Sequence, residues 1–344
     1  MRIGLIDVDG HHYPNIPLMK ISAFHRKNGD SVEWYDPKTS GHLNRVYMSK
    51  VFSFTPDYPY EVTADEVIKG GSGYVIRCES GYEIYESERD KNLPYEVEHI
   101  YPDYSLYPEM TADAAYGFLT RGCPRECSFC HVAAKEGRCS VKVADLSEFW
   151  KGQKRIVLCD PNILACKDSG ELLAQLAESR ARVNFNQGLD IRLVNEKNLS
   201  LLQKIRADNV HFAFDRYQDW DIIVPKMRMV KEVTGWNRNR GRPGVYVLVN
   251  YDTTTEQDLE RIYLCRSLEW TPYIMIYNKS VFFDRRGRLN PKEELLKEHT
   301  MEEIEHVRIC QRMQRWCNNF IFWKVPKFED YDPRAYRKKA RAGA

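Results

Sequence analysis

Three cysteines stand close together in the chain, at Cys123, Cys127 and Cys130. Three residues separate the first pair and two the second, in the run Thr-Arg-Gly-Cys-Pro-Arg-Glu-Cys-Ser-Phe-Cys-His that follows an apolar stretch at 115–119. Three thiolates on one loop can hold an iron–sulfur cluster, but they are one short of saturating four irons. The spacing therefore predicts a cluster with one iron open to another ligand.

The same spacing, with the aromatic residue Phe129 directly before the last cysteine, resembles the signature of the radical S-adenosylmethionine (SAM) superfamily. The resemblance implies a [4Fe–4S] cluster whose open iron chelates the amino and carboxylate groups of SAM. It also implies that one electron cleaves SAM to methionine and a 5′-deoxyadenosyl radical, which abstracts a hydrogen from a substrate. A low-potential electron donor is then a required partner, and the substrate stays open among a small molecule, a peptide and RNA.

Two other interpretations of the cysteines remain. One is a structural zinc or iron–sulfur site that only staples a loop of a binding or regulatory protein, with His131 as a fourth zinc ligand. Zinc sites usually repeat a Cys-x2-Cys pair or add a distant His/Cys pair, and neither pattern is evident here. The other is a set of ordinary buried thiols.

Composition and charge narrow the class of protein. The 344 residues are 43% hydrophobic and 29% charged, and 51 Lys and Arg stand against 49 Asp and Glu. A formal net charge of +2 does not predict a nucleic-acid partner. No apolar stretch approaches the length of a membrane span and no signal peptide is recognisable, so we expect a cytoplasmic protein without membrane contact. We interpret Cys310 and Cys317, one heptad apart on a predicted helix, as packing residues.

Residues 1–110 are predicted to form a small parallel α/β domain. Apolar strands and a helix alternate there, with strands expected at 2–7, 31–36 and 45–55, a helix at 17–27, and a fourth strand ending at 68–73. The stretch at 93–110 is rich in Pro, Tyr and acidic residues and is interpreted as a linker to the next domain.

This first domain resembles the cobalamin-binding-like domain of one branch of radical SAM enzymes. The matching positions are Pro14 to Leu18 and the pair Gly70-Gly71. Cobalt-ligating domains of this kind carry Asp-x-His-x-x-Gly, whereas here Asp9 and His11 are followed by a proline in place of the glycine. We favour a domain that keeps the shape without cobalamin, and cobalamin-dependent radical SAM methyl transfer stays as an alternative.

Residues 111–290 are predicted to form a partial (β/α)6 barrel, the form that a radical SAM core takes. Amphipathic segments lie between most of six apolar runs, which occur at 115–119, 156–159, 183–189, 210–214, 245–249 and 273–277. Residues 291–344 are predicted to be a C-terminal helical extension, which begins with a capping box at Thr300 and Glu303, and a basic tail. The fold class is therefore α/β, with a small parallel domain before the barrel and a helix after it.

Polar residues follow the predicted strands, and the carboxyl ends of barrel strands form the active-site face. By resemblance, Asp215 and Gln187 are expected to contact SAM, and Arg192 to pair with its carboxylate through a bidentate fork. Phe129 is similar to the aromatic residue whose neighbouring backbone meets adenine. Structural alternatives are a surface ion pair of Arg192 with Asp190 or Glu196, and a packing role for Phe129.

One family motif is missing. The Gly-Gly-Glu motif that meets the SAM amino group in many relatives is absent after the second barrel strand, where Cys159-Asp160-Pro161-Asn162 stands. Asp160 or Asn162 is a candidate substitute for that contact. Gly122, before the first cysteine, is expected to let the loop backbone approach the cluster closely.

Overall fold

The computed structural model describes residues 1–79, 82–284 and 286–336, and the chain divides into two compact units. Unit 1 contains residues 1–187 and 204–206, and unit 2 contains residues 188–203 and 207–344. This division does not coincide with the predicted boundaries near residues 110 and 290, which stay predictions. The basic positions 337–341 of the predicted tail lie outside the described residues.

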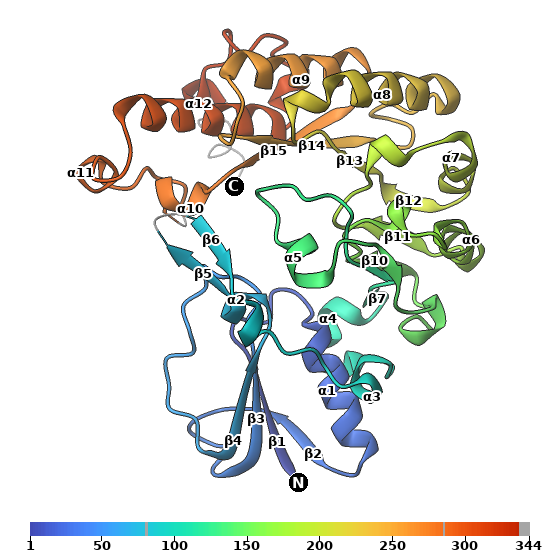
Figure 1. Ribbon diagram of the computed structural model, residues 1–344, viewed down its shortest axis with the longest axis vertical. Helices are drawn as coiled ribbons and strands as arrows, with labels where there is room; N and C mark the ends of the chain where they lie inside the picture. The colour runs from blue at the N-terminus through green and yellow to red at the C-terminus, as the bar shows by residue number, and fades with distance from the viewer. Residues whose placement is uncertain (80–81, 285, 337–344) are drawn as a thin grey trace. The chain divides into compact units, whose positions relative to one another are not determined.

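Unit 1 begins with a parallel four-stranded sheet in the order β2-β1-β3-β4 (Figure 1). Its strands are β1 (Arg2–Asp7), β2 (Ser31–Trp34), β3 (Leu43–Ser49) and β4 (Ala64–Gly70). Helix α1 (Ile16–Lys27) buries Leu18 and Met19 completely on its apolar face. The predicted parallel α/β arrangement is therefore confirmed. Strand β3 ends at Ser49, before the predicted end at 55, and the exposed Phe52 and Phe54 lie in the following loop.

The prediction of a linker at 93–110 was wrong. This stretch contains α3 (Tyr95–Glu98), a 3₁₀ turn (Tyr104–Leu106) and α4 (Pro108–Thr111). Val97, Leu106 and Tyr107 are buried in the same core as α1, and the Tyr107 hydroxyl donates to Asp7 Oδ2 at 2.8 Å. Large apolar side chains at irregular spacing can fill the gaps between other elements without forming a periodic helix or strand of their own.

A second parallel sheet in unit 1 carries the cysteine loop. Strand β10 (Arg155–Leu158) pairs in parallel with both β7 (Ala114–Gly117) and β11 (Arg182–Phe185). The unit also contains α2 (Ser72–Val75), β5 (Ile76–Glu79), β6 (Tyr82–Tyr85), β8 (Thr120–Arg121), α5 (Val132–Glu136), β9 (Val141–Lys142) and α6 (Ser169–Ser179). Helix α7 (Glu196–Leu202) and strand β12 (Arg206–Asn209) follow along the chain.

Unit 2 is built on a parallel sheet in the order β13-β14-β15 (Figure 1). Its main elements are β13 (His211–Ala213), α8 (Trp220–Thr234), β14 (Gly244–Val249), α9 (Thr255–Ser267), β15 (Thr271–Ile276), α10 (Lys279–Phe282), α11 (Lys292–Leu295) and α12 (Met301–Asn318). The predicted capping box at Thr300 and Glu303 starts α12. At its other end, Asn318 Oδ1 accepts from the Ile274 backbone amide at 2.8 Å, which ties α12 to β15.

Strands of parallel sheets and helices between them thus form at the predicted barrel segments. A partial barrel stays a prediction. No helix among the described residues has the length and apolar character needed to cross a membrane.

Candidate active site

The cysteine loop leaves the carboxyl end of β7 and is closed at its base by a short antiparallel pair. Strand β8 pairs with β9 through Thr120 opposite Lys142 and Arg121 opposite Val141. The Cys123 amide donates to the Gly137 carbonyl at 3.1 Å inside this base. The three cysteines therefore lie on a loop whose two ends are held together.

Asp160 anchors the base of the loop from the neighbouring strand. Because β7 and β10 are parallel, their carboxyl ends meet, and Asp160 lies directly after β10. Its carboxylate accepts from the Leu119 and Thr120 amides, at 2.6 Å for Thr120, and from Thr120 Oγ1 at 2.7 Å. Burial raises the pKa of Asp160 to about 6, although these hydrogen bonds oppose the shift.

Asn162 contacts the first cysteine directly. Its buried side-chain amide donates from Nδ2 to Cys123 Sγ at 3.4 Å, and the Arg125 backbone amide donates to the same sulfur at 3.4 Å. Ser140 Oγ donates to the Asn162 carbonyl at 2.9 Å, which fixes the Asn162 backbone beside the loop. Asp160 and Asn162 thus shape and contact the cysteine loop, and the SAM amino-group contact considered for them from the sequence stays a prediction.

Gly122 lies in close contact with the backbone at the other end of its own loop, while the close approach to a cluster stays a prediction. Its φ is +83°, and a Cβ atom there would lie 2.2 Å from the Cys139 carbonyl oxygen. The Gly122 amide donates to Glu136 Oε2 at 3.2 Å. No other residue type fits this position without moving the loop.

The cysteine loop has the chemistry of a cluster site. Cys123 and Cys127 are half-buried and Cys130 is exposed, and none of the three is in a disulfide. Amide donors to a cysteine sulfur stabilise the thiolate charge that a cluster requires. His131, the fourth ligand of the zinc alternative, lies with its Nε2 2.8 Å from Glu83 Oε2. The residues present fit a [4Fe–4S] cluster held by the three thiolates.

Five other cysteines behave as packing residues. Cys159, Cys166, Cys265, Cys310 and Cys317 are all buried. Burial raises the pKa of Cys159 to about 11 and that of Cys265 to about 12, so both thiols stay protonated at neutral pH.

Phe129 and Gln187, two of the predicted SAM contacts, belong to unit 1. Phe129 is half-buried on the cysteine loop between Cys127 and Cys130. Gln187 follows β11 and is exposed. Their SAM contacts stay predictions.

Arg192 and Asp215, the other two predicted SAM contacts, belong to unit 2. Arg192 binds two carboxylates of the chain: Nε lies 2.7 Å from Asp190 Oδ1, and a terminal nitrogen lies 2.7 Å from Asp219 Oδ2. The structural alternative of a pair with Asp190 is therefore observed, with Asp219 in place of Glu196 as the second partner. A SAM contact of Arg192 stays a prediction.

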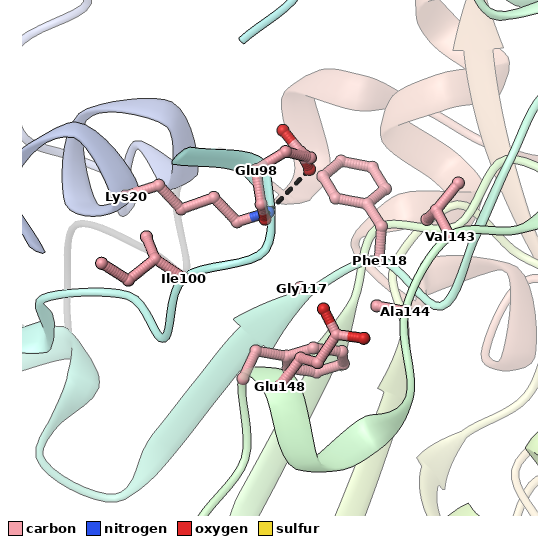
Figure 2. A pocket seen from close by; sticks show the side chains of 9 residues that line it. Lys20, Glu98, Ile100, Gly117, Phe118, Val143, Ala144 and Glu148 are labelled. Carbon is pink, nitrogen blue, oxygen red and sulfur yellow. Dashed lines mark hydrogen bonds and ion pairs between the residues drawn. The ribbon is translucent and has the colours of Figure 1, made fainter. Parts of the chain in front are cut away.

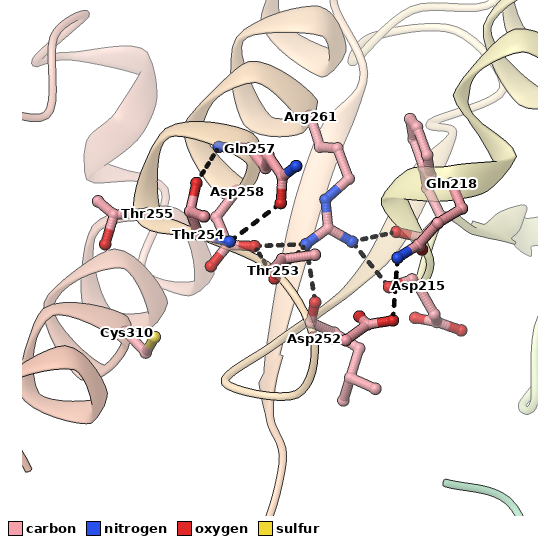
Figure 3. Close-up of polar contacts among 12 residues, drawn as sticks. Asp215, Gln218, Asp252, Thr253, Thr254, Thr255, Gln257, Asp258, Arg261 and Cys310 are labelled. Atoms are coloured by element: carbon pink, nitrogen blue, oxygen red, sulfur yellow. Dashed lines mark hydrogen bonds and ion pairs between the residues drawn. The ribbon is translucent and has the colours of Figure 1, made fainter. Parts of the chain in front are cut away.

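Asp215 carries an unsatisfied carboxylate oxygen. The side chain is partly exposed, but Oδ1 is inaccessible and has no hydrogen-bond partner among the residues that the structure describes. Burial raises the pKa of Asp215 to about 6, against the opposing effects of Arg261, the Leu248 backbone amide and Arg192. Figure 3 shows Asp215 beside the buried guanidinium of Arg261, which donates to the Phe214 and Asp215 carbonyls. A buried acceptor without a donor is a candidate site for a ligand ammonium or hydroxyl group.

Two of the polar strand ends are explained by turn geometry alone. Asn250 has a φ of +63° and Asn278 a φ of +50°. Asparagine is one of the few residue types that adopt the left-handed region readily. These two positions therefore need no functional role.

The first domain has an open hollow at the carboxyl edge of its sheet. Its volume is about 370 Å³, and its lining includes His11, Trp34 and Tyr107. The Asp9 carboxylate accepts from the amides of Val51 and Phe52 in the loop after β3. Asp9 therefore ties the loop after β3 to the segment after β1. Cobalamin binding by this domain stays the alternative stated from the sequence.

A smaller cavity lies between α1 and the loop after β7 (Figure 2). Its volume is about 10 Å³, which is room for one water molecule. Lys20 and Glu98 form an ion pair of 2.6 Å at its edge. The cavity is too small for SAM.

Comparison with known proteins gives distant structural matches. No family model matches the chain, and no curated protein matches its sequence. The structure of Streptococcus suis SuiB bound to precursor peptide SuiA is similar with a TM-score of 0.37 and 12% identity, over 65% of this chain and 54% of that one. SuiB bound to S-adenosylmethionine gives 0.36 and 11%, over 65% and 52%. The chain spans about half the length of SuiB, and a likeness at this TM-score does not identify a function.

Proposed function

We propose that the chain is a radical SAM enzyme that holds a [4Fe–4S] cluster at Cys123, Cys127 and Cys130. The cluster, when bound, supplies the electron that cleaves SAM and so generates the radical that abstracts a substrate hydrogen. The observation that carries the proposal is the cysteine loop itself: three cysteines in the family spacing, none of them in a disulfide, with the Asn162 amide donating to the first sulfur.

The residues of unit 1 have distinct tasks in this proposal. Asp160 holds the base of the loop through the amides of Leu119 and Thr120. Gly122 lets the backbone pass close to Cys139, and Asn162 orients and polarises the Cys123 sulfur. Phe129, Gln187, Arg192 and Asp215 are proposed to contact SAM on the strength of the family resemblance, and the substrate is unassigned among small molecules, peptides and RNA.

Iron binding after anaerobic reconstitution tests the cluster, with two exposed cysteines as a matched pair. Cys130 belongs to the motif, whereas Cys139 lies near the end of the same loop outside it. We expect Cys130→Ala to lose most of about four irons per chain, and Cys139→Ala to keep them. Equal iron content in the two variants contradicts the proposal, and bound zinc that survives chelation supports the staple instead.

A further inference from the structure

Unit 2 contains a second cluster of metal-binding side chains, formed by two helices. Asp258 lies on α9, and His306 and Cys310 lie on α12. One ligand atom of each residue lies within 4.8 Å of the ligand atoms of the other two. His306 and Cys310 are four residues apart and therefore share a face of α12. Figure 3 shows Cys310 facing the Asp258 side of α9.

The spacing of the ligand atoms suits a tetrahedral metal ion. Cys310 Sγ and His306 Nε2 are 3.5 Å apart. With zinc–sulfur and zinc–nitrogen bonds of about 2.3 and 2.0 Å, tetrahedral geometry separates these two ligands by about 3.5 Å.

Asp258 supplies an independent sign of a missing partner. Its side chain is 0% exposed, and Oδ1 accepts from Arg261 and, at 2.6 Å, from Thr253 Oγ1. Its Oδ2 is buried and has no hydrogen-bond partner within the described part of the chain. An unpaired buried carboxylate oxygen costs free energy that a bound cation would recover.

Two other interpretations explain less. A Cys310 nucleophile activated by His306 would need contact with a substrate, but Cys310 is 0% exposed. A simple thiol–imidazole hydrogen bond would satisfy Cys310 and His306 and still leave Asp258 Oδ2 without a donor. A metal ion accounts for all three side chains together.

We propose that Asp258, His306 and Cys310 bind a zinc ion that clips α9 to α12. A soft thiolate, an imidazole and a carboxylate form a ligand set that zinc accepts, with water in the fourth position. His306 is half-buried, which gives the ion a path from solvent, and its Nδ1 lies 3.5 Å from Thr255 Oγ1, which can fix the ring. This site lies in unit 2 and is independent of the proposed cluster.

Zinc content tests the proposal in a full-length protein whose Cys123, Cys127 and Cys130 are replaced by alanine, because that protein cannot load metal on the cysteine loop. After zinc addition and gel filtration, we expect one zinc per chain by elemental analysis. Cys310→Ala and His306→Gln should lose it. Cys317→Ala is the matched control, because Cys317 is an equally buried thiol one heptad further along α12, and it should keep the metal.

Cobalt(II) gives a second readout that does not depend on stability. The cobalt-loaded parent and the Cys317→Ala variant should show a thiolate-to-cobalt charge-transfer band that Cys310→Ala lacks. If Cys310→Ala fails to fold, His306→Gln still tests the site, because His306 is only half-buried. A parent protein without stoichiometric zinc, or equal metal loss in the Cys317 and Cys310 variants, overturns the proposal.

Discussion

Hydrogen bonds to sulfur are one way in which a single residue tunes an iron–sulfur site, and Asn162 provides such a bond. Its amide reaches Cys123 from the end of the neighbouring strand, 39 positions along the chain. Asp215 in unit 2 has the opposite property, because one of its buried oxygens lacks a donor. The Asn162 hydrogen bond should affect the reduction potential of the cluster, and the Asp215 oxygen should affect stability and SAM binding.

Replacement of Asn162 by alanine should lower the reduction potential of the reconstituted cluster. A donor to the Cys123 sulfur stabilises the added negative charge of the reduced cluster, so its loss favours the oxidised form. A redox titration followed by electron paramagnetic resonance measures the shift. Because Ser140 binds the Asn162 backbone carbonyl, the loop position should survive the change. An unchanged or higher potential would rule out this role.

Asp215→Asn should stabilise the fold and weaken SAM binding. Burial places the pKa of Asp215 at about 6, above the usual 3.8. The folded protein therefore binds more protons than the unfolded chain between about pH 4 and pH 6, and stability falls as pH rises through that range. The cost at pH 7 is at most about 3 kcal/mol, and nearer about 1 kcal/mol after solvent screening.

Urea unfolding at several pH values measures the stability effect. Asp215→Asn should raise the unfolding free energy at pH 7, flatten its fall between about pH 4 and pH 6, and weaken SAM affinity on the order of tenfold. Asp219→Asn is the control, because Asp219 is already paired with Arg192 and its loss should not stabilise the protein. A less stable Asp215→Asn protein at pH 7 is incompatible with this account.

At the scale of elements, the parallel pairing of β7 and β10 brings the cysteine loop and its supporting residues together. Leu158 of β10 lies opposite Gly117 of β7, so both strands end at the same edge of the sheet. The loop after β7 then depends on its own backbone geometry, in which two glycines with positive φ frame the cysteines.

Gly122→Ala should abolish cluster loading, whereas Gly137→Ala should largely preserve it. Both glycines have positive φ, at +83° and +102°, so each substitution costs on the order of 1–3 kcal/mol in backbone strain. Only at Gly122 would the added Cβ collide with backbone, at 2.2 Å from the Cys139 oxygen, since nothing lies within 4 Å at Gly137. Iron content after reconstitution measures the difference, and similar loading of the two variants would show that the close approach is unimportant.

Most helices and strands were predictable from the sequence, because the spacing of apolar residues along the chain is a local property. The apolar run at 245–249 became β14, and the capping box at Thr300 began α12. The stretch at 93–110 was misjudged because Val97, Leu106 and Tyr107 are buried by elements distant in sequence.

The cysteine motif was also predictable from the sequence, since its three cysteines lie close together in the chain. The contact of Asn162 with Cys123, and the approach of Asp258 to His306 and Cys310, depend on the pairing and packing of separate elements. No local pattern reports such contacts. A polar residue directly after a buried strand was the one available signal for Asp160 and Asn162.

At the scale of the whole molecule, each unit contains one of the two proposed metal sites. Unit 1 holds the cysteine loop and its supporting residues, and unit 2 holds Asp215, Arg192 and the proposed zinc clip. Each can be tested by its own variants in the full chain, because iron content reports on the first and zinc content on the second.

Reductive cleavage of SAM is the most direct test of the proposed function. Anaerobically reconstituted wild-type protein should change its cluster spectrum when SAM is added, and should form 5′-deoxyadenosine and methionine with a strong reductant. Cys130→Ala should form neither. The account is contradicted if wild-type protein with a full complement of iron shows no spectral change with SAM and forms no 5′-deoxyadenosine. The cysteine loop would then have a structural role only.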